Sequence, residues 1–331
     1  MASEEEGKGR PVSDNREATS ASADHYDYLK SPLNPCSIET IPYPIPVVGD
    51  SKTPSQSQSQ PQQRRAWPCM VACYQLEEAK QQRVGRLDLF SIPVPPDDVV
   101  DLTDDSSSPP KLSLGTPMTV FDGKSGILDG KFFGRKKVVD SEGDDLKNDT
   151  FFYASAHSTG EIRIFSVDPT ESSSYLASET EQKQPFEVSC RAISESSDDG
   201  ALCLALSWEA NEEPSRIVSS YSDGTAAIHK VGSLVGPDTS AELELETRWN
   251  AHSIFRQPAE VWSCCFLDDS TVMTAGEDGS VKVWDTRLPF TNAVHTMKLF
   301  DAGATALSPH PRIPHIVACG SYDETLALWD R

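Results

Sequence analysis

The chain has 331 residues, enough for one large domain or two ordinary ones, and 37% of them are hydrophobic. Its formal net charge of −22 argues against a nucleic-acid partner or an anionic membrane surface, because both require clustered Lys and Arg. The start, MASEEEGKGR, has no apolar signal-peptide core, and no apolar run approaches the roughly 18 residues of a membrane span. We therefore expect a cytoplasmic protein without membrane insertion.

In chain order, residues 1–35 are polar and acidic and are predicted to be mostly disordered, with a possible closing strand. Two low-complexity stretches, 51–65 and 93–111, are predicted to be insertions. Between them lie short runs in which apolar residues alternate with polar ones and end at Gly or Asp turns. These runs are CSIETI, MVACYQLEEAKQQRVGRLDLFSI, SGILDGKFF, YASAHSTGEIRIFSV, LCLALSW, VSSYSDGTAAIHKV and EVWSCCFL. The pattern predicts one all-β domain over 36–331.

The eight cysteines contain no CxxC pair. We expect them to be reduced and mostly buried thiols, because a zinc site would need closer ligand spacing and a histidine partner. No cofactor and no metal site is predicted.

The end of the chain contains a repeat. The stretch TAGEDGSVKVWDTR, Thr274–Arg287, is followed by the similar ACGSYDETLALWDR ending at Arg331, and Trp284 and Trp329 lie 45 positions apart. A period of about 40–45 residues that ends in Trp-Asp is typical of a β-propeller blade. Traced backwards, the runs form about five groups of three strands, so a WD-repeat β-propeller with about five blades is predicted.

The clearest copy also contains the residues of a hydrogen-bonded WD-repeat tetrad. In that arrangement His252 links the turn acid Asp278 to the hydroxyl of Thr274, which in turn reaches the Trp284 indole. The alternative is a catalytic triad of the first three residues. We favour the structural interpretation, because a buried polar chain of this kind joins strands and is tolerated only when every member is paired.

The last copy is weaker. Cys319 replaces the hydroxyl residue, and only Asp301 or the displaced His295 could stand in for the histidine.

Several stretches resemble one family, the WD-repeat diphthine methyl ester hydrolases of diphthamide synthesis, often named diphthine methyltransferases. They are CSIE, ACYQL, RVGRLDLFSI, SGILDGKF, LALSW, WNAHSIF, GEDGSVKVWDTR and GSYDETLALWD, in that order. The resemblance covers about 36–331. It implies that the intact family has a seven-bladed propeller. We expect this chain to act without a cofactor and as a monomer. The resemblance also implies hydrolysis of a methyl ester on a modified histidine of translation elongation factor 2, a step whose product is then amidated.

The family has further blades beyond the position of Arg331. The chain is therefore expected to be truncated inside its fifth blade, and a catalytic residue in the absent blades would leave it inactive.

No GxSxG elbow, HExxH motif or Gly-rich phosphate loop is present. Ester hydrolysis still needs a base and a donor to the oxyanion. We expect one propeller face to hold the substrate, with Asp323 or Glu324 as base and Tyr322 as donor. The non-catalytic alternatives are a turn-stabilising role for Asp323 and a solvated position for Glu324. The predicted substrate-binding face comprises Glu260, Trp262 and Glu277.

A second function remains open, because most propellers of this type only bind other proteins. The chain would then be a non-enzymatic scaffold, for example in membrane-protein recycling or as a ubiquitin-ligase substrate adaptor.

Overall fold

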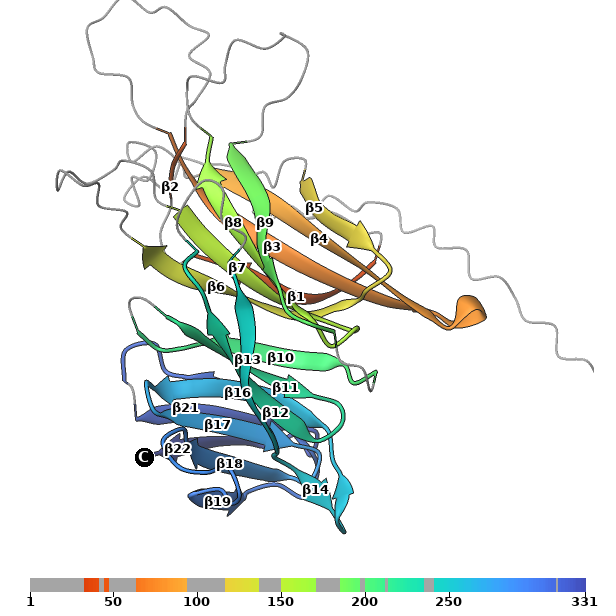
Figure 1. Cartoon of the computed structure of the whole chain (residues 1–331), viewed down its shortest axis with the longest axis vertical. Coiled ribbons are helices and arrows are strands. Elements are labelled where there is room, and N and C mark those ends of the chain that lie inside the picture. The colour runs from red at the N-terminus through yellow and green to blue at the C-terminus, as the bar shows by residue number, and fades with distance from the viewer. Residues whose placement is uncertain are drawn as a thin grey trace, which may run out of the picture.

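The computed structural model describes residues 33–41, 45–47, 64–93, 117–136, 150–170, 185–196, 200–211, 214–234, 241–313 and 315–331. Within these ranges the chain forms five antiparallel sheets of three or more strands and one two-stranded hairpin (Figure 1). The predicted all-β class is confirmed. The predicted N-terminal segment and both insertions lie almost entirely outside the described residues, and only their edges enter strands.

The sheets follow one another along the chain. The first sheet contains β1 (Asn34–Thr40), β2 (Ile45–Val47), β3 (Arg64–Glu77), β4 (Gln82–Pro93) and β5 (Met118–Gly123), with the 3-10 helix η1 (Glu78–Lys80) in its longest hairpin. The second sheet contains β6 (Ile127–Lys136), β7 (Thr150–His157), β8 (Ile162–Pro169) and β9 (Phe186–Ile193). The third sheet contains β10 (Cys203–Trp208), β11 (Arg216–Tyr221), β12 (Thr225–Val231) and β13 (Leu243–Asn250).

The remaining strands complete the molecule. The hairpin consists of β14 (Ser253–Ile254) and β15 (Gln257–Pro258). The fourth sheet contains β16 (Val261–Asp268), β17 (Thr271–Gly276), β18 (Ser280–Asp285) and β19 (His295–Lys298). The fifth sheet contains β20 (Ala304–Pro309), β21 (Ile316–Ser321) and β22 (Leu326–Asp330).

Glycine fixes the central hairpin turn in three of the sheets. Gly160, Gly224 and Gly279 have φ angles of +82°, +82° and +69°. Such left-handed backbone matches the twist of the flanking strands and is open to glycine without a steric penalty. The backbone therefore favours the glycines of the Asp-Gly and Thr-Gly pairs that mark the repeat in the sequence.

The first strand of each sheet packs beside the first strand of the next. Contacts run from β1 to β6, from β6 to β10, from β10 to β16 and from β16 to β20. These five strands line one cavity, and the later strands of each sheet lie progressively farther from it. Successive sheets sharing an axis in this way form the β-propeller arrangement that the repeat predicts.

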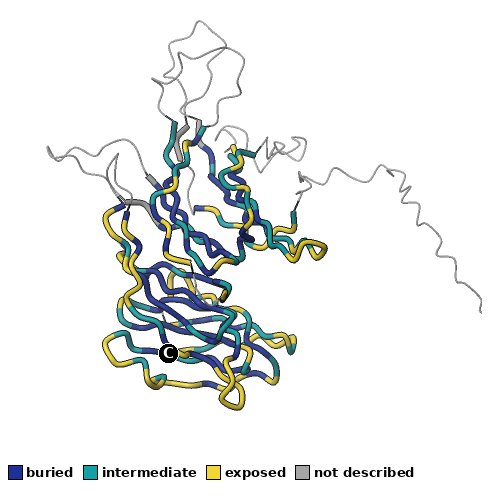
Figure 2. The backbone as a smooth tube through the Cα atoms, turned by 45° about the vertical axis from the view of Figure 1, so that its right-hand side comes forward, coloured by how far each residue is buried: buried dark blue, intermediate teal, exposed yellow. Residues whose placement is uncertain are grey.

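The core lies in layers between consecutive sheets. One cluster of buried residues joins the first and second sheets and another joins the second and third, while two more join the third to the fourth and the fourth to the fifth. Figure 2 shows the buried backbone running through the sheet interiors, with exposed residues at the turns. Full burial of a large apolar side chain contributes roughly 1.5–3 kcal/mol, so these layers dominate the stability.

Each of the first four sheets has an outer strand that the sequence did not reveal. These strands are β5, β9, β13 and β19, so the predicted groups of three strands are too small. The strand β13 explains the omission, since LELETRWN carries exposed acids and reads as a polar segment. An edge strand with one solvated face gives only a weak apolar signal.

None of the eight cysteines forms a disulfide, and six of them are buried. Within the described ranges, no helix has the length and apolar character to cross a bilayer. The same residues contain no group of three or more His, Cys, Asp or Glu side chains placed to hold a metal ion.

Candidate functional site

The four predicted tetrad residues form one chain of hydrogen bonds in the fourth sheet. The His252 imidazole lies with Nδ1 2.8 Å from Asp278 Oδ1 and with Nε2 2.8 Å from Thr274 Oγ1. The Trp284 indole donates its Nε1–H to the same hydroxyl over 2.9 Å. Because Asp278 accepts only, the network assigns the ring proton to Nδ1 and makes Thr274 the donor to Nε2.

The environment of these four hydrogen-bonded residues opposes acid–base catalysis by them. His252 and Thr274 are buried, so no protein substrate reaches them. Burial lowers the pKa of His252, although Asp278 works in the opposite direction. Burial alone would raise the pKa of Asp278, but hydrogen bonds from His252 and Ser280 hold it below its ordinary value. A neutral, buried imidazole between two paired groups joins strands, which is the role the tetrad interpretation predicts.

The last repeat makes the corresponding turn with different atoms. Asp323 accepts hydrogen bonds from the backbone N–H of Thr325 at Oδ1 and of Asp301 at Oδ2, each over 2.9 Å. Asp301 thus replaces the histidine through its main chain, while His295 lies exposed on β19. Cys319 is fully buried at the position of the missing hydroxyl.

Three of the predicted site residues meet between the fourth and fifth sheets: Trp262 and Glu277 of the predicted substrate-binding face, and the predicted donor Tyr322. The Trp262 indole donates its Nε1–H to Glu277 Oε2 over 2.8 Å. The ring of Trp262 also lies 6.2 Å, centroid to centroid, from that of Tyr322, with the two planes at 86°. Tyr322 is 65% exposed. The face predicted from the sequence therefore contains one contiguous group, which we call the aromatic corner: Trp262, Tyr322 and Glu277.

The other two predicted acids flank this group. Glu260 is half-buried, and its carbonyl accepts the backbone N–H of Glu277 over 2.9 Å. Glu324 follows Asp323 in the turn and is exposed, with its backbone at φ +67°. Among the described residues no side chain hydrogen-bonds the Glu324 carboxylate, so this group is available to a ligand.

The aromatic corner adjoins the cavity at the centre of the sheets. This cavity has a volume of about 530 Å³ and is lined by Trp262 together with residues of all five first strands. Its wall carries Lys131, whose Nζ lies 2.7 Å from Glu39 Oε1 and 3.2 Å from Asp129 Oδ1. Burial works to lower the pKa of Lys131, but the two carboxylates raise it, so the lysine stays charged.

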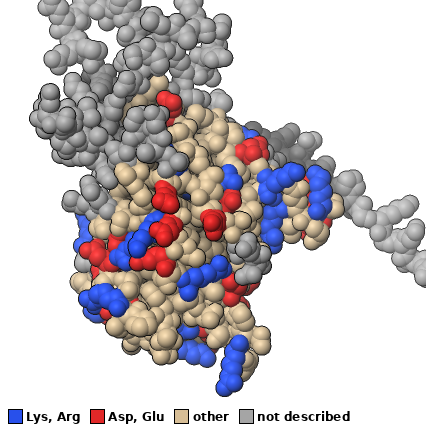
Figure 3. Space-filling view, in the orientation of Figure 1, with Lys and Arg blue, Asp and Glu red and all other residues tan. Residues whose placement is uncertain are grey.

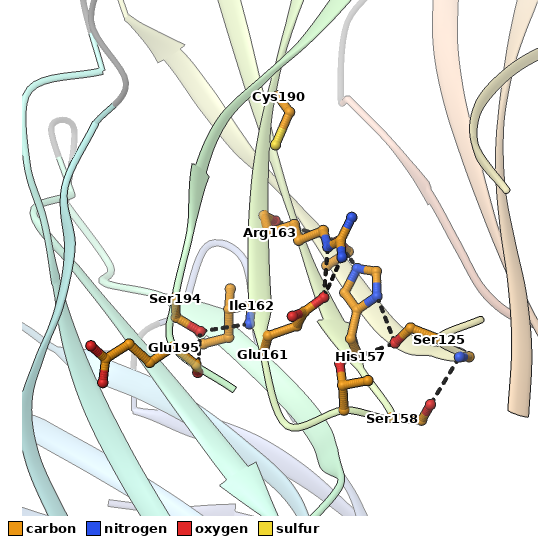
Figure 4. A network of polar contacts seen from close by, with 12 residues as sticks. Ser125, His157, Ser158, Glu161, Ile162, Arg163, Cys190, Ser194 and Glu195 are labelled. Atoms are coloured by element: carbon orange, nitrogen blue, oxygen red, sulfur yellow. Dashed lines mark hydrogen bonds and ion pairs between the residues drawn. The ribbon is translucent and has the colours of Figure 1, made fainter. Parts of the chain in front are cut away.

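Sequence reasoning missed a second polar network, in the second sheet (Figure 4). His157 lies with Nε2 2.9 Å from Ser155 Oγ and with Nδ1 3.2 Å from Ser125 Oγ. The nearby Arg163 pairs with Glu161. The available signal was the histidine of YASAHSTGEI, two residues before the predicted Thr-Gly turn. Its serine partner Ser125 lies in the bend between β5 and β6, and no spacing rule identifies it.

A serine beside a histidine suggests a nucleophile and its base, yet the surroundings argue otherwise. Both Ser155 and His157 are fully buried. Burial, and then the charge of Arg163, lower the pKa of His157 to about 3, so the ring stays neutral and accepts a proton poorly at neutral pH. A third network in the next sheet joins Ser219, Tyr221 and His229 in the same manner. These networks are structural.

Charged side chains of both signs are interspersed over the described part of the face in Figure 3.

Comparison with known proteins supports the repeat assignment. Residues 244–285 match the WD domain, G-beta repeat family. A diphthine methyltransferase homolog of Dictyostelium discoideum is 33% identical over 184 residues, which are 52% of this chain and 43% of that protein. The diphthine methyltransferase of Homo sapiens is 33% identical over 145 residues, or 40% of this chain and 29% of that protein.

A chain in a crystal structure of the mitotic checkpoint complex aligns with 94% of this chain and 71% of its own length, at 12% identity and a TM-score of 0.45. The matched segments span less than half the length of the two diphthine methyltransferase relatives. The chain therefore contains a WD40 repeat and, over about half of its length, is a homologue of proteins named diphthine methyltransferase.

Proposed function

We propose that this chain acts in diphthamide biosynthesis by hydrolysing the methyl ester of methylated diphthine on translation elongation factor 2. The observation that carries the proposal is the 33% identity over 184 residues to the diphthine methyltransferase homolog. The reaction consumes water and the ester and yields a carboxylate, a proton and methanol. It needs no cofactor.

The geometry between the fourth and fifth sheets supplies candidates for both required roles. An ester carbonyl placed against the aromatic corner would lie near the Tyr322 hydroxyl, which can donate a hydrogen bond to the developing oxyanion. The carboxylate of Glu324 is exposed and uncommitted, so it can accept a proton from an attacking water. We assign Tyr322 as the oxyanion donor and Glu324 as the general base.

Asp323 fits the base role less well. Desolvation works to raise its pKa, but hydrogen bonds from Thr325 and the Asp301 backbone keep it below its ordinary value. A carboxylate held in this way accepts a proton weakly. We assign Asp323 to the turn, where its two oxygens fix the backbone that presents Tyr322 and Glu324.

A protein substrate needs a docking surface beside the reacting group. The β14–β15 hairpin provides one, since its tip residue Phe255 is 96% exposed. Phe255 and Arg256 both have positive φ angles, +50° and +68°, which non-glycine residues rarely adopt. Strained, exposed aromatic residues of this kind gather at binding sites. The hairpin precedes Glu260 in the chain and closes through the Ala259 N–H to the His252 carbonyl.

The test is release of methanol from elongation factor 2 that carries methylated diphthine, with the full chain as enzyme and no methyl donor present. We expect release from that substrate alone. We expect Glu324→Gln and Tyr322→Phe each to lower the rate by about 100-fold, the typical contribution of a base or an oxyanion donor. Glu244→Gln, an exposed acid on β13, is the matched control and should leave the rate unchanged. Absence of release by the purified folded chain would refute the proposal.

The scaffold alternative draws on the same hairpin, because an exposed Phe255 serves any protein partner. It predicts that elongation factor 2 is bound without loss of its methyl ester, or not bound at all while another complex is retained. Phe255→Ala separates the esterase function from the scaffold function. In an esterase this change should raise KM with kcat nearly unchanged, since it removes docking area and no reacting group.

A further inference from the structure

The first sheet brings two cysteines together where its strands β1 and β3 pair. Cys36 is the extra residue of a bulge in β1. The residue before it lies opposite Cys73 on β3, and the residue after it lies opposite Ala72. Neighbouring antiparallel strands hold opposite Cα atoms about 4.5–5.5 Å apart, within the roughly 4.4–6.8 Å that a disulfide spans. The register therefore places Cys36 and Cys73 within disulfide reach.

Both thiols belong to the face of this sheet that turns away from the second sheet. On β1 the residue next to Cys36 reaches the second sheet, since Ser37 Oγ donates to the Gly130 carbonyl over 3.3 Å. On β3 the residue next to Cys73 is Ala72, which packs into the buried cluster that joins the two sheets. Because side chains alternate between the two faces along a strand, Cys36 and Cys73 share the opposite face.

The two thiols differ in their access to solvent. Cys36 is exposed, whereas Cys73 is fully buried. The Cys36 thiol donates to the Asn34 carbonyl over 3.5 Å. Burial, and then the neighbouring Cys73, raise the pKa of the Cys36 thiol, although a hydrogen bond with the Tyr74 backbone works in the opposite direction. An oxidant from solvent therefore meets Cys36 first, and Cys73 is placed to react second.

We infer that Cys36 and Cys73 form a modification site, a dithiol that low-molecular-weight disulfides such as glutathione disulfide oxidise reversibly. The Cys36 thiolate attacks one sulfur of the oxidant and displaces a thiolate, which leaves a mixed disulfide on Cys36. Cys73 loses its proton to solvent and attacks Cys36 Sγ, so the mixed disulfide breaks and the second thiolate leaves. Two protein thiols become one disulfide, and the oxidant becomes two thiols.

The new bond would clamp an edge strand. β1 lies at one edge of the first sheet and carries Glu39, whose Oε1 lies 2.7 Å from Lys131 Nζ at the wall of the central cavity. A disulfide that ties β1 to β3 also holds Glu39 beside this lysine. Hydrogen exchange of the β1 amides should therefore slow by about tenfold on oxidation, because local opening of the strand is restricted.

The test treats the full chain with glutathione disulfide at about pH 8.5, where more of the Cys36 thiol is ionised, and maps disulfides by mass spectrometry of tryptic peptides. We expect a link between Cys36 and Cys73. In Cys73→Ala, glutathione should stay on Cys36, at an occupancy about tenfold above that in the parent chain. Cys69→Ala is the matched control, because Cys69 is a buried cysteine on the same face of β3 and on the same tryptic peptide. The link should form in that variant as in the parent chain.

Cys190 is an internal reference in every sample. It is also exposed, but Phe165 lies opposite it on β8, so it should retain glutathione as a mixed disulfide. Equal glutathione occupancy on Cys36 and Cys190 in the parent chain would overturn the inference, and this comparison needs no variant to fold. A linked Cys36 in Cys73→Ala that is folded by circular dichroism would overturn it as well. The dithiol does not depend on ester hydrolysis, so methanol release by a chain that forms no link would refute the dithiol alone.

Discussion

The fourth and fifth sheets carry the same turn and the same Trp-Asp ending, yet they use them differently. In the fourth sheet Trp284 is 3% exposed and its indole is hydrogen-bonded to Thr274. In the fifth sheet Trp329 is half-buried and Cys319 takes the place of the hydroxyl. Asp278 pairs with a histidine, whereas Asp323 pairs with backbone N–H groups.

The difference in burial between the two tryptophans follows from the number of sheets that pack against each of their own sheets. The fourth sheet packs on the third through one buried cluster and on the fifth through another. The fifth sheet contributes to only one cluster among the described residues, and Leu326 and Leu328 on β22 are 71% and 72% exposed. The repeat motif thus specifies hydrogen bonds within a sheet, while burial is decided by the sheets on either side. A motif match alone does not give the stability contribution of a blade.

Truncation of the two tryptophans should show the largest contrast. We expect Trp284→Ala to lower the free energy of unfolding by about 3–5 kcal/mol, because it leaves a cavity and removes the indole hydrogen bond to the buried Thr274 hydroxyl. Trp329→Ala should lower it by about 1 kcal/mol, since its side chain already meets solvent. Urea unfolding followed by circular dichroism measures both. Equal losses would show that the motif, and not the packing around it, sets the contribution.

Acidification should destabilise the second, third and fourth sheets through their buried histidines. Burial lowers the pKa of His157 to about 3 and that of His229 to about 4, and it also lowers that of His252. The unfolded chain therefore binds more protons than the folded chain below about pH 6.5, so stability falls as the pH falls through that value toward about 4. His157 and His229 should each remove about 2 kcal/mol of unfolding free energy by about pH 5.

The measurement is urea unfolding between about pH 7 and pH 5. The matched variant is His157→Gln, which should be less stable at neutral pH. The slope of its unfolding free energy against pH should be smaller by the uptake of about one proton. A slope unchanged in that variant would contradict the assignment of the histidine as a buried neutral group.

The paired turn acids give a smaller contrast. Asp278→Asn should lower the unfolding free energy by about 1–2 kcal/mol, because it weakens hydrogen bonds from His252 and Ser280 within a partly buried site. Asp323→Asn should lower the unfolding free energy by less than Asp278→Asn does, since the exposed backbone donors around Asp323 can turn to water. Thermal unfolding of the two variants beside the parent chain would measure the difference. A larger loss from Asp323→Asn would refute this ranking.

The sequence predicted the inner strands of every sheet because each carries alternating apolar residues next to a Gly or Asp turn. It also identified the four tetrad residues, since their spacing is local to one blade. It missed the β14–β15 hairpin, because Phe255 and Arg256 are not turn-forming residues and only the backbone shows their positive φ angles.

The candidate site shows the same limit. Glu277 and Tyr322 occupy equivalent positions in two repeats, which is why the sequence placed them on one face. Their connection through Trp262 depends on how the fourth sheet packs against the fifth, and that geometry has no counterpart in sequence spacing. The Ser125–His157 contact was missed for a related reason, since its partners lie 32 residues apart, one in the bend between β5 and β6 and the other at the end of β7.

The smallest contrast lies at the third turn position, where the fourth sheet has Gly279 and the fifth has Glu324. Both backbones are left-handed, at φ +69° and +67°. A glutamate in this conformation costs about 1 kcal/mol relative to glycine, so Glu324→Gly should raise the unfolding free energy by about 0.5–1 kcal/mol. If Glu324 is the general base, the same change should remove methanol release.

The reverse change tests why the fourth sheet keeps glycine. A Cβ at Gly279 would lie 2.7 Å from the Phe300 carbonyl oxygen, so Gly279→Ala adds a clash to the strained backbone and should lower the unfolding free energy by about 1–2 kcal/mol. Chemical denaturation of both variants measures the two signs together. Stability gained by Glu324→Gly with activity lost would show that the fifth sheet retains a strained acid for its chemistry. Stability lost in both variants would instead mean that the glutamate side chain supports the fold.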